Sequence, residues 1–295
     1  MKIAVVGLGG VGGYIAANLV KTSHEVVGFA RGEHLRAIQE KGLSIIEDTQ
    51  TWNVKLDARE IYEAEGIFDV VLFCVKSYDL EASYQAISAH VDASSVLLCF
   101  SNGVSHGEIL RQISQSKVLD GCLYILSHQE SPGVIRKKGK VFAAVFGGLE
   151  EEAKELKSVF DAAGLRAKIP DDIQTDIWKK YIFIAAFATL TSYYDKSIGY
   201  VCAHYFDQAE ETLKEVAMLA YAKGIDIFDE VEKSLDIAKG LPYDASTSMH
   251  LDFTNKKRDE LETLTGFIVK EAKKLHVEVP RMAQMYEELL TKHNF

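Results

Sequence analysis

The chain has 295 residues, of which 47% are hydrophobic and 26% are charged, and its formal net charge is −10 at pH 7. This length accommodates about two domains with a substantial core, and the composition is that of a folded globular protein. The acidic balance excludes nucleic acid and anionic membrane surfaces as expected partners, because both are bound by basic patches.

Residues 2–20, KIAVVGLGGVGGYIAANLV, carry a single charge, at Lys2. A run of this length imitates a membrane span or the apolar part of a signal peptide. Its glycines argue against both, because each costs a helix roughly 1 kcal/mol relative to alanine. The stretch instead predicts a buried strand at residues 3–6, a glycine turn, and a helix over residues 11–21.

The turn has the G-x-G-x-x-G spacing of a dinucleotide-binding loop, with Gly7, Gly9 and Gly12 at its glycine positions. In such a loop the first glycine allows a tight turn, the second admits the pyrophosphate, and the third lets the helix pack on the strand. The free N–H groups and positive dipole end of the helix would face the phosphates. The residues expected to bind the dinucleotide are Gly7, Leu8, Gly9, Gly10, Val11 and Gly12.

The rest of the first half alternates strand-like runs with helical patterns. Strands are expected at residues 3–6, 25–30, 70–75, 96–100 and 118–125, and helices at 11–21, 33–41, 79–90 and 106–114. This alternation predicts a parallel sheet with helical crossovers. Two strand-like runs around RKKGK predict an antiparallel hairpin over residues 133–148, followed by a charged helix at 150–163 and a short strand at 165–169.

A boundary is expected at Pro170, after which every pattern is helical, with turn signals at Gly224, Gly240 and Pro280. The run YIFIAAFATL, residues 181–190, is apolar on every side but too short to cross a bilayer. It predicts a core helix, which could also serve a homodimer. The expected fold class is therefore α/β, in two domains. An N-terminal Rossmann-type parallel-sheet domain, 1–169, binds the dinucleotide, and an all-α C-terminal domain, 170–295, carries substrate-binding and catalytic groups.

The end of the second expected strand indicates which dinucleotide is bound. Proteins that prefer NAD place an acidic residue there, about twenty positions past the glycines, to bind the adenosine ribose. This strand ends Gly28-Phe29-Ala30-Arg31, without a carboxylate. A guanidinium at Arg31 can hold the 2′-phosphate of NADP through charge-assisted hydrogen bonds. The alternative is a solvated surface arginine; we expect NADP.

Neither the cysteines nor the histidines form a recognisable chemical motif. The four cysteines, Cys74, Cys99, Cys122 and Cys202, have no C-x-x-C spacing, and the nine histidines show no H-E-x-x-H pattern. No metal site is expected. Buried thiols fit a reducing compartment, so the expected location is the cytoplasm.

Residues 103–107, GVSHG, match the G-x-S-x-G nucleophile elbow of serine hydrolases, and they lie between an expected strand and helix. A hydrolase of that kind does not open with a dinucleotide loop. Ser105 and Glu108 also fit a capping box, in which the two side chains satisfy N–H groups at a helix start. The sequence therefore predicts a helix cap at Ser105.

Several short motifs follow the glycine loop in a fixed order. They are Ala30-Arg31-Gly32, Val75-Lys76, Ser101-Asn102-Gly103, Trp178-Lys179-Lys180, Ser248-Met249, Glu260-Leu261-Glu262 with Gly266, and His276 to Pro280. Each is weak alone, but their order and spacing over almost the whole chain resemble the ketopantoate reductase (2-dehydropantoate 2-reductase) family. The resemblance implies a two-domain, NADPH-dependent enzyme that reduces ketopantoate, a small 2-oxo acid, to pantoate in pantothenate biosynthesis.

The resemblance also assigns roles by position. It implies that Arg31 binds the 2′-phosphate, that Lys76 lies near the cofactor ribose and phosphates, and that Asn102 lies by the nicotinamide ribose and the substrate. Among these, only the role of Arg31 has independent support from the residue pattern.

Three positions in the second half match catalytic or substrate-binding residues of the family. Lys180 matches its catalytic lysine, Ser248 a substrate-binding serine, and Glu260 a carboxylate near the reaction centre. Hydride delivery to a ketone puts negative charge on oxygen, which a cation able to give a proton stabilises. Without the resemblance, Lys180 would be read as a charge at a helix start and Glu260 as part of a solvated face.

The match departs from the family at two positions. Members usually have asparagines four and eight residues after the catalytic lysine, where this chain has Ile184 and Ala188. Thr191 lies near the same helical face and could supply one hydroxyl. The substrate is therefore ketopantoate bound through other groups or a more apolar 2-oxo acid. A third alternative is an NADP(H)-binding regulator without catalysis.

Overall fold

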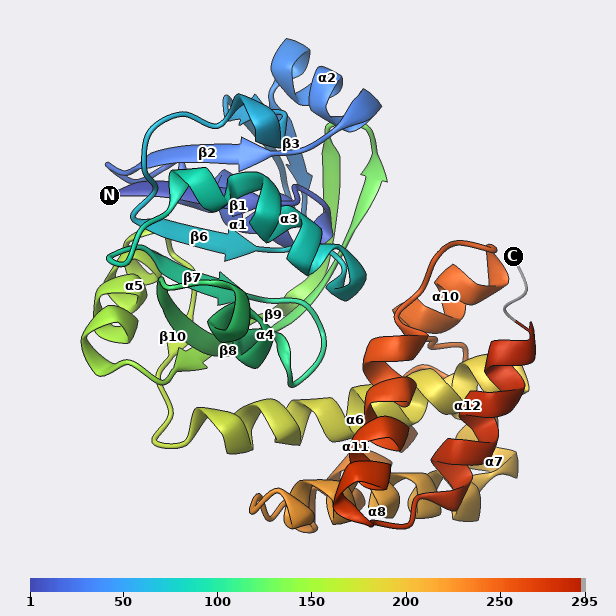
Figure 1. The fold of residues 1–295 in the computed structure, drawn as a ribbon. Coiled ribbons are helices and arrows are strands. Elements are labelled where there is room, and N and C mark those ends of the chain that lie inside the picture. Colours follow the sequence, from blue (N-terminus) through green and yellow to red (C-terminus); the bar gives the residue numbers. More distant parts are fainter. Residues whose placement is uncertain (293–295) are drawn as a thin grey trace. The chain divides into compact units, whose positions relative to one another are not determined.

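The computed structural model describes residues 1–292, and the chain forms two compact units (Figure 1). The first unit comprises residues 1–101 and 105–173, and the second comprises residues 102–104 and those from 174 onward. The division falls a few residues after the expected boundary at Pro170. Residues 102–104, which were expected in the first domain, group with the second unit because Val104 packs against its apolar core.

A ten-stranded sheet forms the centre of the first unit, in the order β4-β3-β9-β8-β7-β6-β1-β2-β5, with β10 paired to β9. The strands are β1 (Lys2–Val6), β2 (Glu25–Phe29), β3 (Leu43–Ile46), β4 (Thr51–Val54), β5 (Asp57–Arg59), β6 (Val70–Phe73), β7 (Val96–Cys99), β8 (Lys117–Ser131), β9 (Val134–Gly147) and β10 (Ala167–Lys168). From β5 to β8 all pairs are parallel. The predicted parallel sheet is confirmed.

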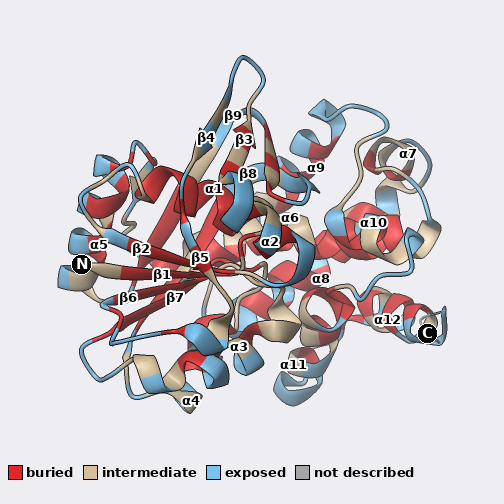
Figure 2. Ribbon diagram, turned by 90° about the horizontal axis from the view of Figure 1, so that it is seen from above, coloured by how far each residue is buried: buried red, intermediate tan, exposed pale blue. Residues whose placement is uncertain are grey.

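Helices cover both faces of this sheet, because successive residues along a strand belong to two different apolar cores, one on each face. On β1, Ile3 and Val5 belong to the core under α1 (Gly10–Leu19), α2 (Gly32–Lys41) and α5 (Glu150–Ala162). The intervening Ala4 and Val6 belong to the core under α3 (Leu80–Ile87) and α4 (His106–Ile113). Short 3₁₀ turns lie at η1 (Ile61–Glu63), η2 (Ser77–Asp79) and η3 (Ser88–His90). Figure 2 shows the central strands β1, β2, β6 and β7 as largely buried.

The predicted hairpin over residues 133–148 is wrong. RKKGK lies inside one continuous strand, β9, which pairs antiparallel with β8 from Asp120↔Gly147 to Ser131↔Val134. The turn is at Gly133, where φ is +74°. Charged residues remain in the strand because they find partners: Arg136 pairs with Glu130, and Lys137 donates to the carbonyl of Gly139.

Three short strands, β3, β4 and β5, were not predicted from the sequence. Each has at most four residues, and β4 and β5 take their places at the two ends of the strand order. Exposed and half-buried residues alternate along β4. Short edge strands with polar side chains give a weak periodic signal in the sequence. The edge segments β4 and β5 are therefore identified as strands only by their pairing with β3 and β2.

The second unit is helical throughout its described residues, as predicted. Its helices are α6 (Ile173–Tyr194), α7 (Ile198–His204), α8 (Phe206–Ala222), α9 (Asp229–Gly240), α10 (Ser248–Thr254), the π-helix η4 (Glu262–Gly266), α11 (Phe267–Leu275) and α12 (Pro280–Lys292). Residues 181–190 lie within α6, and most are buried in the core of this unit, which confirms the predicted core helix. Along residues 1–292, no helix has both the length and the apolar character that spanning a bilayer requires.

Candidate dinucleotide and catalytic sites

The glycine loop connects β1 to α1, and two of its three motif glycines are required by packing. Gly7 has φ +92°, a conformation that favours glycine. A Cβ on Gly12 would lie 1.9 Å from the carbonyl oxygen of Gly7, so the helix could not approach the loop. Gly9 differs, because a Cβ there would meet nothing within 4 Å. The open space at Gly9 fits the approach of a pyrophosphate to the backbone.

The first turn of α1 leaves N–H groups for an anion. Gly9 is the N-cap, and no side chain caps the helix. The first intrahelical bond is donated by the N–H of Gly13 to the carbonyl of Gly9, at 2.8 Å. The N–H groups of Gly10, Val11 and Gly12 come before this bond, and the helix offers them no carbonyl acceptor. This arrangement fits the phosphates of a dinucleotide.

Two further glycines, outside the G-x-G-x-x-G spacing, are explained by β8 and β9. A Cβ on Gly10 would lie 2.7 Å from the Cα of His128 on β8. A Cβ on Gly13 would lie 2.8 Å from Cγ1 of Ile135 on β9. The glycine-rich stretch therefore serves two purposes, since the same helix start faces the loop and packs against the β8–β9 pair.

His34 on α2 supports the loop and was missed at the sequence level. Its Nε2 lies 2.8 Å from the carbonyl of Leu8, and the N–H of Gly133 donates to its Nδ1 at 3.0 Å. Burial lowers the pKa of His34, an effect that the bond to Leu8 partly offsets. A neutral ring with hydrogen on Nε2 satisfies both partners. No local signal marks this residue, because Leu8 is 26 positions away in sequence.

Arg31 and Lys76 follow the ends of β2 and β6. Arg31 is the N-cap of α2, and its side chain is 86% exposed, with Nη2 3.6 Å from the carboxylate of Asp79. No acidic side chain stands between Phe29 and Arg31. An exposed guanidinium beside a strand end that carries no carboxylate fits the 2′-phosphate of NADP. Lys76 is half-buried and precedes η2.

In the second unit, the structure brings together two of the predicted site residues. The ammonium of Lys180, on α6, donates a hydrogen bond to Oδ1 of Asn102 at 3.1 Å. The two residues are 78 positions apart, and both are half-buried. An amide oxygen holds the ammonium in place without removing its charge or its protons.

Glu260 is 2% exposed and lies two residues before the π-helix η4, rather than on the solvated face that its charged neighbours suggest. The hydroxyl of Tyr181 donates to the carbonyls of Thr263 and Leu264 in this segment, at 2.9 and 2.8 Å. Burial raises the pKa of Tyr181 well above its usual value, so the hydroxyl remains a donor. Tyr181 thereby fixes the helix of Lys180 against the segment that follows Glu260.

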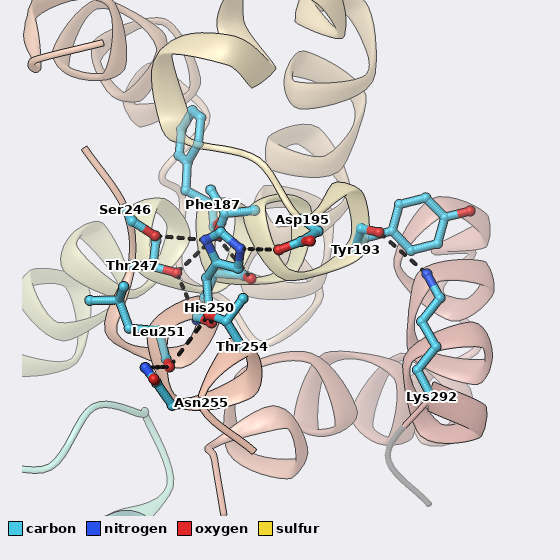
Figure 3. A network of polar contacts seen from close by, with 12 residues as sticks. Phe187, Tyr193, Asp195, Ser246, Thr247, His250, Leu251, Thr254, Asn255 and Lys292 are labelled. Carbon is cyan, nitrogen blue, oxygen red and sulfur yellow. Dashed lines mark hydrogen bonds and ion pairs between the residues drawn. The ribbon is translucent and has the colours of Figure 1, made fainter. Parts of the chain in front are cut away.

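Ser248, the predicted substrate-binding serine, is the exposed first residue of α10. The preceding Thr247 caps α10 by accepting from the N–H of His250. Thr247, which is labelled in Figure 3, also shares a 2.8 Å hydrogen bond with the hydroxyl of Thr191. The expectation that Thr191 offers a hydroxyl to substrate is wrong. That hydroxyl is 0% exposed and already donates to the carbonyl of Phe187.

Both positions where the family usually has asparagine are occupied here by apolar residues in apolar surroundings. Ala188 is 1% exposed and belongs to the core of the second unit. Ile184 is half-buried and packs against the same core. Neither residue can donate or accept a side-chain hydrogen bond, so any polar substrate group must be bound by other residues.

The predicted capping box at Ser105 is wrong. Ser105 is the N-cap residue of α4, but its side chain accepts no capping bond, and Glu108 instead accepts from Gln112. Its backbone has φ −104° and ψ −3°, away from the extended conformation that aims a cap side chain at the helix. The glycine of the apparent elbow has a packing role, because a Cβ on Gly107 would lie 1.8 Å from Oδ1 of Asp120.

The cysteines form no bridges. None of the four is part of a disulfide bond, and Cys99 and Cys122 are buried. Within residues 1–292, no three His, Cys, Asp or Glu side chains come together in an arrangement that could hold a metal ion.

The fold and these sites define a dinucleotide-dependent oxidoreductase, with a β1–α1 glycine loop in one unit and a lysine–amide pair in the other. Comparison with known proteins gives the family. The family model "Ketopantoate reductase PanE/ApbA" matches residues 3–150, and its C-terminal counterpart matches residues 172–293. The chain belongs to the ketopantoate reductase family. It is an NADP-dependent oxidoreductase.

Individual relatives share the whole length of the chain. An uncharacterized oxidoreductase, YkpB, of Bacillus subtilis is 30% identical, over 98% of both chains. The 2-dehydropantoate 2-reductase of Pyrococcus abyssi is 26% identical, over 95% of this chain and 94% of that one. The crystal structure of a 2-dehydropantoate 2-reductase from Porphyromonas gingivalis is 33% identical, with a TM-score of 0.85, and covers 98% of this chain and 99% of that one. A PanE/ApbA family ketopantoate reductase from Ralstonia eutropha is 28% identical, with a TM-score of 0.93, and covers 100% and 99%.

Proposed function

We propose that this protein reduces 2-dehydropantoate (ketopantoate) to pantoate with NADPH, a step of pantothenate biosynthesis. The observation that carries the proposal is the hydrogen bond between Lys180 and Asn102, two residues that match the catalytic and substrate-side positions of the family. The two residues are 78 positions apart in sequence and are hydrogen-bonded in the second unit, which supports a common role in one site.

The chain's own residues suit the cofactor. The N–H groups at the start of α1 and the open space at Gly9 would receive the pyrophosphate. Arg31 would hold the 2′-phosphate and Lys76 would lie near the ribose and phosphates. The bound cofactor supplies the hydride for the ketone carbon.

Lys180 has the central role in the proposed chemistry. A ketone that accepts a hydride develops negative charge on its oxygen, which a nearby ammonium stabilises. The same ammonium can give the proton that completes the alcohol. Asn102 holds the ammonium through its amide oxygen, a neutral acceptor that leaves the lysine charged. Ser248 would bind the 2-oxo acid, and Glu260 would orient the lysine or share a proton network with it.

The second candidate substrate is a more apolar 2-oxo acid. Ile184 and Ala188 favour it, because a site that lacks hydrogen-bonding partners discriminates little in favour of a polar ligand. The same cofactor site and the same lysine would serve either substrate.

A matched substrate pair tests the proposal. The loss of NADPH absorbance is measured with ketopantoate and with its analogue that lacks the 4-hydroxyl group. If the site hydrogen-bonds this hydroxyl, kcat/KM for ketopantoate should exceed that for the analogue by more than about a hundredfold. A ratio near or below one identifies the apolar substrate class instead. Tight NADPH binding without turnover of any 2-oxo acid would identify a regulator.

We also propose that the protein is located in the cytoplasm and that it forms a homodimer. The free cysteines support a reducing compartment. The apolar run of α6 is already accounted for by the core of the second unit, so a dimer would need another surface. Light scattering on the purified protein measures the oligomeric state.

A further inference from the structure

His250 lies at the meeting point of three segments of the second unit. It is on α10, and its side chain bridges the end of α6 and the loop that precedes α10. Its Nε2 is 2.9 Å from Oδ1 of Asp195, and its Nδ1 is 2.7 Å from the hydroxyl of Ser246 (Figure 3). The residue is buried, and both ring nitrogens have partners. We call these three residues the His250 clamp.

The protons of the clamp can be assigned from its partners. An ionised carboxylate can only accept, so Nε2–H donates to Asp195, and in the neutral ring Nδ1 accepts from the hydroxyl of Ser246. A protonated ring would donate from both nitrogens, and Ser246 would then accept. The clamp therefore keeps its two hydrogen bonds in either state of the ring.

Asp195 is held in an uncommon conformation at the end of α6. Its φ is +52°, in the left-handed region, and its side chain is 66% exposed. Asparagine and aspartate tolerate this region better than other non-glycine residues. The turn of the backbone at this position directs the carboxylate toward His250.

The residues before Ser248 are fixed one after another. Ala245 accepts from the N–H of Ile198 at 2.8 Å, Ser246 is bound to His250, and Thr247 is bound to Thr191. α10 itself has only seven residues, too few to be stable by its own hydrogen bonds. Its orientation therefore depends on these side-chain links.

We propose that His250, held between Asp195 and Ser246, is a positioning residue that sets the direction of the Ser248 hydroxyl for the carboxylate or keto group of the 2-oxo acid. The inference rests on the proposed function in that Ser248 binds the substrate. His250 acts through α10, two residues past Ser248, and is not itself catalytic. The sequence motif Ser248-Met249 contains no sign of it.

Two substitutions at Asp195 test this role with the backbone kept comparable. Asp195→Gly removes the acceptor for His250, whereas Asp195→Asn retains an oxygen acceptor; both residues tolerate a positive φ. We expect Asp195→Gly to raise KM for the 2-oxo acid about tenfold, the size of one lost hydrogen bond to a charged group. Its kcat and its KM for NADPH should change less than about twofold. Asp195→Asn should restore the KM of the unmodified protein.

Thermal unfolding of both variants is measured beside the kinetics. Asp195→Gly with an unchanged KM would overturn the inference, whether or not the variant melts earlier, as would equal increases of KM in the two variants. A drop in kcat together with both KM values would overturn it too, since that pattern indicates general damage. These results differ from failure of the proposed function, in which the unmodified protein itself reduces no 2-oxo acid.

Discussion

The glycine loop and the site around Lys180 are built in opposite ways. The loop uses consecutive residues, 7–12, and its shape follows from the glycine at each turn or contact. The second site joins Asn102 and Lys180, which are 78 positions apart in sequence, and the proposed function adds Ser248 and Glu260 to it. Side-chain hydrogen bonds from Tyr181 and Thr191 hold their helices in place. A local site can therefore be recognised from spacing, whereas the dispersed one depends on packing.

The largest effect is expected from Lys180→Ala. It removes the proposed acid and the charge that stabilises the developing alkoxide, so kcat should fall by about a thousandfold. NADPH affinity, measured by fluorescence titration, should stay nearly unchanged, because Gly9 and Arg31, the residues proposed to bind the pyrophosphate and the 2′-phosphate, belong to the first unit. Lys179→Ala, one residue away, is the control and should keep most of its activity. Equal losses of turnover and NADPH binding would assign Lys180 to the cofactor instead.

The next effect separates two glycines of the loop. Gly12→Ala places a Cβ against the carbonyl of Gly7 and should lower the free energy of unfolding by about 1–3 kcal/mol. Gly9→Ala meets open space, so stability should be almost unchanged while NADPH binding weakens. Chemical denaturation and NADPH titration measure both. If Gly9→Ala bound NADPH normally, the pyrophosphate would have to lie elsewhere.

Arg31→Ala should reduce the preference for NADPH over NADH by roughly 10- to 100-fold, the range for hydrogen bonds to a charged group. The measurement is the ratio of kcat/KM for the two cofactors. Arg36→Ala, an exposed arginine on the same helix, is the control. An unchanged ratio in Arg31→Ala would favour the solvated surface arginine, which the sequence also allowed.

The smallest expected effect concerns His34 and pH. Its pKa in the folded protein is lowered from the ordinary 6.5, so the unfolded chain takes up a proton first as the pH falls. Stability should therefore decrease from about pH 6.5 downward, because protonation sets an N–H on Nδ1 against the N–H of Gly133. In His34→Gln, which does not titrate, that part of the pH dependence of the melting temperature should be missing. An identical pH profile would contradict the assignment.

Several features followed directly from the sequence. The strand–turn–helix of residues 2–20, the parallel strands, the helical second half and the core helix at 181–190 were all expected and are present. Each rests on a pattern within a short window: glycine spacing, β-branched runs or an apolar helix. The family was also recognised from the sequence, because its motifs are short local patterns that occur in a fixed order along the chain.

The errors share a physical cause. RKKGK was read as a break between two strands, but Arg136 pairs with Glu130 on β8, Lys137 donates to the carbonyl of Gly139 within β9, and the strand continues. Thr191 was read as available to substrate, but its hydroxyl is already hydrogen-bonded to the hydroxyl of Thr247 and to the carbonyl of Phe187. In both cases the outcome depends on side-chain hydrogen bonds and ion pairs that form only in the folded chain.

By itself, the amino-acid sequence determined the central parallel strands and most of the helices, the dinucleotide loop and the kind of chemistry that a lysine can perform on a ketone. Only the tertiary structure decided that Asn102 holds Lys180, that His34 supports Leu8, and that His250 joins Asp195 to Ser246. The reason is that propensity and periodicity act over a few residues. A hydrogen bond between residues tens of positions apart exists only once the chain has brought them within about 3 Å.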